Sequence, residues 1–211
     1  MKLYGYFRSS AAYRLRIALN LKGLEYEQVA VNLLKGEHKA EAYHKVNAQG
    51  FVPALTDGDL TLGQSMAMLE YLEEAYPQVP LLPRDAAGRA RVRQMANIVA
   101  CDIHPLNNLR VLKYIKNTLG ASEDQKTAWY HHWIMEGFQA FEALLVQGGA
   151  QRFCYGDHPT FADVCLVPQV YNARRFNCSL EAFPRIRRIA DHCNRQDAFI
   201  RAQPENQPDA I

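Results

Sequence analysis

The sequence lacks an excess of charge of either sign. Its 24 basic and 22 acidic residues leave a formal net charge of +2 over 211 residues, so no global positive field predicts binding to nucleic acid or to an anionic membrane surface. No apolar run reaches the roughly 20 residues that a membrane-spanning helix needs. Met1 and Lys2 are followed directly by strand-like sequence rather than by a secretory signal. We therefore expect a cytoplasmic protein with no membrane or nucleic-acid partner.

Cysteine is also scarce. The five cysteines are odd in number and widely separated, as Cys101, Cys154, Cys165, Cys178 and Cys193, which favours reduced, buried thiols over a disulfide framework. Two of them precede a histidine by three or four residues, but neither has a second matching pair, so we expect no metal site. The sequence also has no phosphate-loop lysine motif, no Gly-x-Ser-x-Gly turn and no His-Glu-x-x-His zinc helix. These absences exclude several common enzyme classes.

Strand and helix signals alternate over the first eighty residues. Apolar "KLYGY" (2–6) and "EYEQVAV" (25–31) flank a predicted helix over 10–22, which indicates a β-α-β unit. The following signals are a polar helix, two short strands around an Asp-Gly turn, and another helix, at 37–46, 53–62 and 64–76. The order β-α-β-α-β-β-α predicts a small α/β domain.

Proline separates this region from the rest of the chain. Three prolines fall within "YPQVPLLP" (76–83), and proline disfavours helix both in itself and in its predecessor. Beyond it only helical signals follow, at about 86–118, 123–147, 161–175 and 184–193. Strands and helices followed by helices alone indicate two domains. We predict an α/β domain at 1–78, a linker at 79–85 and an all-helical domain at 86–211.

The start of the first predicted helix carries Arg8, Ser9 and Ser10. One serine would cap the helix by accepting a backbone N–H. A guanidinium, two hydroxyls and a helix N-terminus together also favour binding of an anion. Two hydroxyls are more than one cap requires, so a ligand-binding role for one of them stays open.

Two further short segments each allow either a structural or a ligand-binding interpretation. Val52-Pro53 precedes a predicted strand, where proline fits an edge strand or turn, or a cis peptide that turns backbone groups toward an extended ligand. Gln64 and Ser65 open the next helix, where the serine hydroxyl either caps the helix or holds a carboxylate.

Polar residues also interrupt the helical pattern of 102–113. His104, Asn107, Asn108 and Arg110 lie among apolar residues there, which indicates either a ligand site or a solvated helix face. Further on, "TFAD" (160–163) is a Thr-x-x-Asp capping box ahead of an apolar helix, and for it we predict a structural role.

Taken together, these motifs resemble the cytosolic glutathione transferases, with a thioredoxin-like N-terminal domain, Val-Pro before the third strand and Gln-Ser opening the following helix. Within that superfamily the chain is similar to the zeta class, the maleylacetoacetate and maleylpyruvate isomerases. "SSAAYRLRIAL" (9–19) matches the class signature Ser-Ser-Cys-x-x-Arg-x-Arg-Ile-Ala-Leu except at Ala11. The likeness extends through "NLLKG", "LEYLEEAYP", "PLNNLRVLK" and "DVCLVPQVYNARRF", which covers most of both predicted domains.

The resemblance implies a homodimer that binds glutathione as its cofactor. Ser9 would hydrogen-bond the glutathione sulfur. Val52, before a cis Pro53, would pair with the cysteinyl backbone, and the pair that opens the next helix would hold the γ-glutamyl carboxylate. The cofactor-binding set implied for this sequence is Ser9, Val52, Pro53, Gln64, Ser65, His104 and Asn108.

The implied substrate is a small dicarboxylate, held by arginines. Arg8 and Arg175 would face its carboxylates, whereas Arg174, next to Arg175, would face solvent. Arg110 is not a general feature of the family: it either adds a carboxylate contact suited to the shorter maleylpyruvate or is an exposed helical arginine. With Ser9 assigned to the sulfur, Ser10 is the better candidate for the plain helix cap. The alanine in place of the signature cysteine excludes thiol chemistry at that position and favours Ser9 as the catalytic hydroxyl, with Arg8 as the second catalytic residue.

The predicted function is the glutathione-dependent cis–trans isomerisation of maleylpyruvate to fumarylpyruvate in gentisate-type aromatic catabolism. It would proceed by reversible addition of a thiolate to the double bond. Maleylacetoacetate, from tyrosine and phenylalanine breakdown, is the alternative substrate. Two other functions stay open: a broad glutathione transferase or dehalogenase, and a non-catalytic glutathione-binding protein on the same scaffold.

Overall fold

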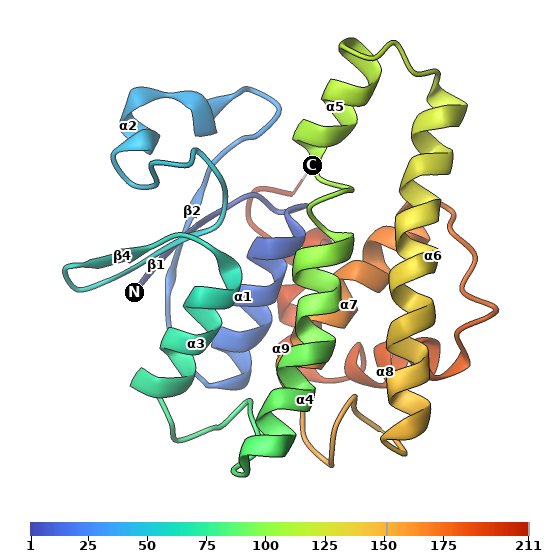
Figure 1. The fold of residues 1–211 in the computed structure, drawn as a ribbon. Coiled ribbons are helices and arrows are strands. Elements are labelled where there is room, and N and C mark those ends of the chain that lie inside the picture. Colours follow the sequence, from blue (N-terminus) through green and yellow to red (C-terminus); the bar gives the residue numbers. More distant parts are fainter. Residues whose placement is uncertain (151, 211) are drawn as a thin grey trace. The chain divides into compact units, whose positions relative to one another are not determined.

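A four-stranded mixed sheet is the framework of the N-terminal part of the chain (Figure 1). Its strands are β1 (Lys2–Gly5), β2 (Glu27–Ala30), β3 (Ala54–Asp57) and β4 (Leu60–Leu62), in the order β2-β1-β3-β4. β1 and β2 are parallel, whereas β3 runs antiparallel to both β1 and β4. Gly58, in the turn between β3 and β4, has a φ of +56°, the left-handed conformation that this short hairpin requires.

Helices complete this part of the chain in the predicted order. α1 (Ser10–Leu21) joins the parallel strands, the segments η1 (Glu37–Lys39) and α2 (Glu41–His44) precede β3, and α3 (Ser65–Ala75) follows β4. α1 and α3 pack against each other through fully buried apolar side chains, among them Leu15, Leu69 and Leu72. The predicted order β-α-β-α-β-β-α is confirmed.

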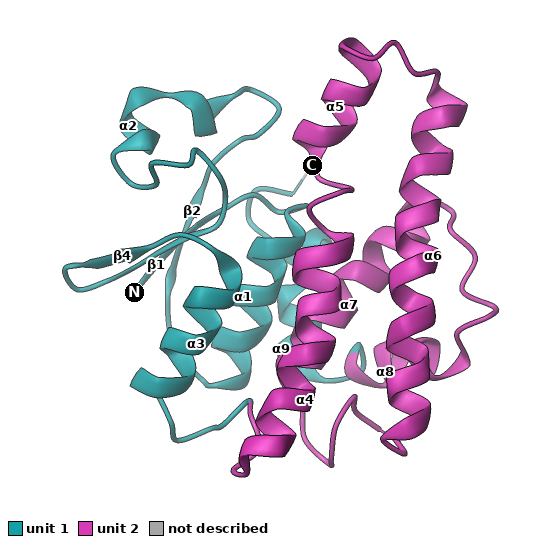
Figure 2. Ribbon diagram, in the orientation of Figure 1, with its two compact units in different colours: residues 1–81, 194–211 teal, residues 82–193 magenta. Residues whose placement is uncertain are grey.

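The computed structural model describes residues 1–150 and 152–210, and these form two compact units (Figure 2). Unit 1 is Met1–Leu81 with Asn194–Ile211, and unit 2 is Leu82–Cys193. The unit boundary at Leu81 lies inside the predicted linker. The C-terminal residues pack with unit 1, whereas the sequence prediction assigned them to the helical domain.

Long-range hydrogen bonds to α1 explain why the C-terminal residues belong to unit 1. Helix α9 (Asp197–Ala202) and the turn η3 (Pro204–Asn206) follow residue 194. The buried Arg16 side chain donates from Nε to the Ala202 carbonyl at 2.9 Å and from Nη2 to the Phe7 carbonyl at 3.0 Å. Burial lowers the pKa of Arg16 to about 10, so this guanidinium stays charged at neutral pH and anchors the tail.

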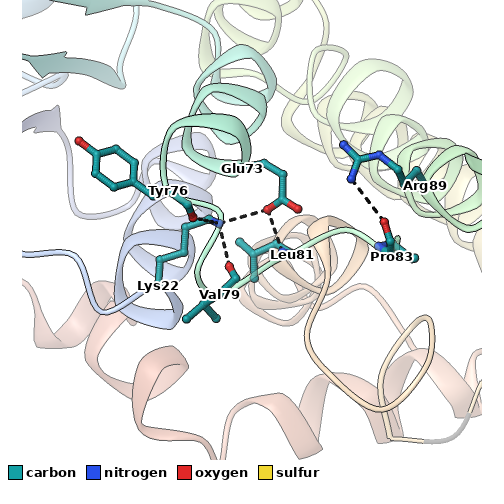
Figure 3. Close-up of polar contacts among 7 residues, drawn as sticks. All are labelled: Lys22, Glu73, Tyr76, Val79, Leu81, Pro83 and Arg89. Atoms are coloured by element: carbon teal, nitrogen blue, oxygen red, sulfur yellow. Dashed lines mark hydrogen bonds and ion pairs between the residues drawn. The ribbon is translucent and has the colours of Figure 1, made fainter. Parts of the chain in front are cut away.

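A buried ion pair holds the chain as it leaves α3 (Figure 3). Lys22 Nζ lies 3.1 Å from Glu73 Oε2, and the two side chains are only 1% and 6% exposed. The same ammonium donates to the carbonyls of Tyr76 at 3.0 Å and Val79 at 2.8 Å. The Leu81 N–H donates to the Glu73 carboxylate at 2.8 Å. Every charge here has hydrogen-bond partners, as buried charges require.

Unit 2 is helical. Its elements are α4 (Ala86–Asn97), the π-helical turn η2 (Ile98–Ile103), α5 (Leu109–Asn117), α6 (Glu123–Gln147), α7 (Phe161–Arg175) and α8 (Pro184–Cys193). The helices expected at 123–147, 161–175 and 184–193 have the predicted bounds. The structure also confirms the Thr160 and Asp163 capping box of α7.

The helix expected over 86–118 is interrupted, which corrects that prediction. α4 ends in the π-helical turn η2, and α5 begins only after Asn108, whose side chain caps it by accepting the Arg110 N–H at 3.1 Å. Pro105 lies in the break, where proline cannot donate to a helical carbonyl. α6 packs against η2 so closely that a Cβ on Gly137 would lie 2.3 Å from the Ile103 side chain. Within residues 1–150 and 152–210, every helix is too short or too polar to cross a membrane.

Candidate functional site

The predicted ligand residues of unit 1 lie in segments at one end of the strands of its sheet. Tyr4 of β1 lies opposite Ala54 of β3, and Leu55 of β3 lies opposite Leu62 of β4. The carboxyl ends of β1 and β4 therefore meet the amino end of β3. Six predicted site residues lie in segments that enter or leave the sheet here: Arg8, Ser9, Val52, Pro53, Gln64 and Ser65.

Ser9, rather than Ser10, is the N-cap of α1. Its φ of −71° and ψ of 116° are extended, and its Oγ accepts the Ala12 N–H at 3.2 Å. The expectation that Ser10 would be the plain cap is therefore wrong: Ser10 is the first helical residue and is 7% exposed. A hydroxyl has one donor and two lone pairs, so capping leaves the Ser9 O–H available to donate to a ligand.

Arg8 precedes this cap and is exposed. Its guanidinium carbon lies 4.7 Å from the centre of the Phe7 ring, a cation–π contact. Phe7 is buried and packs edge-to-face on Tyr6 with ring centroids 4.7 Å apart. Among the described residues, no carboxylate pairs with Arg8. The structure therefore places a cation without an acidic partner beside the N-terminus of α1.

The Val52-Pro53 peptide bond is cis, as the resemblance predicted. Side chains before β3 hold the preceding residue in place. Asn47 Nδ2 and the Tyr43 hydroxyl both donate to the Phe51 carbonyl, each at 2.7 Å. Burial raises the pKa of Tyr43, so its hydroxyl remains a donor at neutral pH.

Gln64 has a backbone conformation that is rare for a residue with a side chain. Its φ is +66° with a ψ of 109°, and such strained positions cluster at functional sites. Its Nε2 donates to Gln49 Oε1 at 2.8 Å. The glutamine stands immediately before the N-terminus of α3, where a helix dipole favours a negative charge.

Ser65, the next residue, is linked to a residue that the sequence prediction missed. Its Oγ accepts a hydrogen bond from Arg14 Nη1 at 3.1 Å, and the two residues are 8% and 2% exposed. Arg14 thus brings a buried positive charge to the start of α3, which strengthens the site as a carboxylate receptor. A signal was present: Arg14 and Arg16 interrupt an otherwise apolar helix, and charges in a helix apolar on all sides are buried.

In unit 2, the predicted residues 104, 108 and 110 lie at the break between η2 and α5. His104 is half-buried and ends η2. The side-chain Oδ1 of Asn108 caps α5 by accepting the Arg110 N–H, which is a structural role. The side-chain amide nitrogen of Asn108 takes no part in this cap. Arg110 is exposed in the first turn of α5.

Arg175 ends α7 and is exposed, like Arg174 before it. Arg174 Nη2 lies 2.6 Å from Asp191 Oδ1. The Arg175 guanidinium instead lies over the Phe176 ring, 4.8 Å from its centre, and among the described residues it has no carboxylate partner. Arg8 and Arg175, the two arginines assigned to the substrate by the resemblance, thus share one arrangement: each stacks on the ring of an adjacent phenylalanine.

Most of the cysteine thiols are buried. All five are free, and all but Cys101 are buried. Burial raises the pKa of Cys154, Cys178 and Cys193, which disfavours their thiolates. Among the described residues, no three His, Cys, Asp or Glu side chains form a group that could hold a metal ion. The three thiols whose pKa burial raises are therefore poor nucleophiles.

The thioredoxin-like sheet of unit 1 and the helices of unit 2 define the glutathione transferase fold. The family model of the glutathione S-transferase N-terminal domain matches residues 1–74, and that of the C-terminal domain matches residues 127–192. A solved structure described as a holo maleylpyruvate isomerase, a bacterial zeta-class glutathione S-transferase, is 52% identical with a TM-score of 0.98, and the match covers 100% of both chains. The chain belongs to the glutathione S-transferase family, in its zeta class.

Two further relatives extend the match. The maleylacetoacetate isomerase of Pseudomonas aeruginosa is 51% identical over 99% of this chain and 98% of its own. The maleylacetoacetate isomerase of Methylobacterium extorquens AM1, solved with bound malonate and glutathione, is 40% identical with a TM-score of 0.96 over 100% of both chains. Enzymes of this family use glutathione, so glutathione is the cofactor.

Proposed function

We propose that the protein isomerises maleylpyruvate to fumarylpyruvate with glutathione as the sulfur nucleophile, and that maleylacetoacetate is the alternative substrate. The observation that carries the proposal is Ser9. Its Oγ accepts the Ala12 N–H, so its own proton can be donated to a thiolate at the N-terminus of α1. Both the hydroxyl and the helix dipole favour the charged form of the sulfur.

The stabilisation of the glutathione thiolate that the reaction requires is modest. A free thiol has a pKa near 8.5, so lowering it by about two units takes roughly 2.7 kcal/mol of preferential thiolate binding. A charge-assisted hydrogen bond contributes about 1.5–3 kcal/mol, and a helix N-terminus adds about 0.3–1 kcal/mol. A hydrogen bond from the Ser9 hydroxyl and the N-terminus of α1 would together be sufficient to lower the thiol pKa by this amount.

The isomerisation proceeds by reversible addition of the thiolate to the double bond of the substrate. A cis carbon–carbon double bond conjugated to a carbonyl does not rotate readily. When the thiolate adds, a carbon–sulfur bond forms and the π electrons move to the carbonyl oxygen as an enolate, which leaves a single bond that rotates. The enolate then reforms its carbonyl and expels the thiolate, so the trans product is released and glutathione is regenerated.

The arginines fit a substrate with two carboxylates. Arg8 and Arg175 are exposed guanidiniums that lack acidic partners among the described residues, and guanidinium forms bidentate bonds with carboxylate. Arg110, exposed on α5, is proposed to add a contact that suits the shorter maleylpyruvate. The malonate of the M. extorquens structure is itself a small dicarboxylate, which supports this class of ligand.

We propose that glutathione is held as in the family. Val52 pairs with its cysteinyl backbone beside Pro53, and Gln64 and Ser65 bind its γ-glutamyl carboxylate, with the Arg14 charge behind Ser65. The roles proposed for His104 and Asn108 toward glutathione come from the resemblance. The five free thiols fit a reducing compartment, the cytoplasm, and we expect a homodimer, which sedimentation equilibrium would test.

The function is tested by mixing the purified protein with enzymatically made maleylpyruvate in the presence and absence of glutathione. The expected result is conversion to fumarylpyruvate that requires glutathione. Maleylacetoacetate, assayed in parallel, identifies the preferred substrate from the ratio of kcat/KM. Absence of glutathione-dependent conversion of either compound would refute the proposal.

The other two functions predict different results, which further assays would detect. A broad transferase or dehalogenase would consume glutathione or release a stable adduct from small halogenated acids. A non-catalytic binding protein would bind glutathione in calorimetry and convert neither substrate.

A further inference from the structure

We propose that Phe176 is a positioning residue that holds Arg175 ready for a substrate carboxylate, and that the segment Trp129–His131 of α6 fixes Phe176 in place. The identity of the substrate rests on the proposed function. The positioning itself rests on contacts within unit 2.

Arg175 is held by an aromatic ring, in contrast to the arginine beside it. Its guanidinium carbon lies 4.8 Å from the centre of the Phe176 ring, whereas Arg174 is paired with Asp191. A long exposed side chain loses rotamer freedom when it binds a ligand. The ring restricts the Arg175 guanidinium beforehand and leaves its N–H groups for an anion.

The Phe176 ring is itself fixed by α6. It stacks on the buried Tyr130 ring with centroids 3.9 Å apart and an interplanar angle of 26°. His131 Nε2 donates to the Phe176 carbonyl at 2.7 Å. Asn177 then turns the chain with a φ of +54°, so α7 ends at this ring. The Arg175 charge opposes the rise in the pKa of Tyr130 that burial causes, which agrees with their proximity.

The same segment of α6 also holds the turn between η2 and α5. Trp129 Nε1 donates to the Leu106 carbonyl at 2.9 Å. Asn107 Nδ2 donates to the Tyr130 carbonyl at 2.9 Å, in a buried bond. Three consecutive residues of α6 therefore tie the end of α7 to the turn that leads into α5. This arrangement restricts the distance between the Cα atoms of Arg175 and Arg110.

Loss of the ring should weaken carboxylate binding more than it slows the chemistry. Without the Phe176 ring, the Arg175 side chain returns to several rotamers and must be ordered again by each ligand. An exposed cation–π contact contributes about 0.5–1 kcal/mol, which corresponds to about a two- to five-fold change in affinity. We expect KM for the dicarboxylate to rise by that factor, with kcat and the affinity for glutathione little changed.

The first measurement is malonate binding to the glutathione-loaded protein by calorimetry, which needs no turnover. Phe176→Leu should raise the malonate Kd by about two- to five-fold, and Phe176→Tyr, which keeps the ring, should restore it. KM for maleylpyruvate should follow the same pattern. The two variants are also compared by thermal unfolding, so that a loss of folded protein is recognised.

Two controls match the test. Arg174→Ala removes the adjacent, paired arginine. Phe183→Leu removes a ring that packs edge-to-face on Phe138 elsewhere in unit 2, with centroids 5.7 Å apart. Both should leave the malonate Kd unchanged, although Phe183→Leu should lower the melting temperature at least as much as Phe176→Leu.

A double-mutant cycle with Arg175→Met decides whether the ring acts through the arginine. Arg175→Met alone should weaken malonate binding, and adding Phe176→Leu should then have no further effect. The proposal is overturned if Phe176→Leu has no effect in the otherwise wild-type protein, if it acts equally in the Arg175→Met background, or if the glutathione-loaded protein binds no malonate. Malonate results as expected, with no isomerisation of either substrate, would retain the positioning role and reject the proposed function.

Discussion

At the scale of single residues, Ser9 has a structural and a chemical task that use different parts of its hydroxyl. The lone pair accepts the Ala12 N–H at 3.2 Å and caps α1, while the proton is proposed to bind the glutathione thiolate. Ser10, inside the first turn, has no part in the cap. The two neighbouring serines can therefore be separated by experiment.

Ser9→Ala should reduce kcat/KM by about 10- to 100-fold, because a hydrogen bond to a charged group is lost. It should cost only about 1 kcal/mol of unfolding free energy, the usual contribution of a helix cap. The thiol pKa of bound glutathione, followed by the ultraviolet absorbance of the thiolate, should rise. Ser10→Ala is the control and should retain the wild-type thiol pKa. An equal loss of activity in both variants would show that the serines act only through folding.

Arg110→Ala tests the proposed extra carboxylate contact. It should raise KM for maleylpyruvate by about 10-fold, as expected when one charged hydrogen bond is removed from a partly exposed site, and should affect maleylacetoacetate less. Lys113→Ala removes another exposed cation of α5 and should change neither value. Unchanged maleylpyruvate kinetics in Arg110→Ala would remove this residue from the substrate site.

At the scale of secondary-structure elements, the Lys22–Glu73 pair joins α1, α3 and the chain that leaves α3 (Figure 3). Lys22→Met should lower the unfolding free energy by about 3–5 kcal/mol, because it leaves the Glu73 carboxylate buried without its cation. Lys2→Met breaks an exposed pair, Lys2 Nζ to Glu27 Oε2 at 3.1 Å with side chains 52% and 58% exposed, and should change the unfolding free energy much less than Lys22→Met. Chemical denaturation measures both. Equal losses would contradict the dependence on burial.

The β3–β4 hairpin is joined to the end of α3 by a pH-dependent contact. The hydroxyls of Tyr76 and Tyr71 donate to Asp57 Oδ2 at 2.5 and 2.8 Å. These bonds lower the pKa of Asp57, and the Asp57 carboxylate raises the pKa of Tyr76 to about 12. The carboxylate therefore stabilises the fold above its unfolded pKa of about 4, and the phenol does so below its unfolded pKa of about 10.

Asp57→Asn should consequently flatten the pH dependence of stability at both ends. In the wild-type protein, the contribution of Asp57 is lost as pH falls below about 4, and that of Tyr76 is lost as pH rises from about 10 toward its folded value. Because these side chains are partly exposed, the effect should not exceed about 1 kcal/mol. Thermal melts from acid to alkaline pH measure it. A variant profile with the same slopes as the wild type would contradict this explanation.

At the scale of the whole molecule, local patterns predicted most elements, and non-local contacts account for some of the differences. The bounds of α6 and α7 were predicted, and both helices begin with a capping box, which is a local signal. The placement of the C-terminal tail was not predictable, because its partner Arg16 is 186 residues away from Ala202 in sequence. The break before α5 has local signals, Pro105 and the Asn108 cap, which the prediction of one helix over 86–118 did not use.

The ligand roles of the site residues were inferred from motifs and stay predictions, and some of their structural contacts could not be predicted. Two adjacent serines are equally good caps by propensity, and the choice of Ser9 depends on the turn in which its N–H donates to the Tyr6 carbonyl at 2.8 Å. Arg14 was missed because its partner Ser65 lies 51 residues away. The stack of Arg175 on Phe176, in contrast, joins neighbours in sequence and could have been proposed from "RRF".

The most direct test of the mechanism is to supply glutathione at about one tenth of the maleylpyruvate concentration and count turnovers per glutathione. Because expulsion of the thiolate regenerates the nucleophile, maleylpyruvate should convert completely to fumarylpyruvate and the thiol titre should be unchanged at the end. Conversion that stops after one equivalent, or a thiol titre that falls as product forms, would contradict reversible thiolate addition.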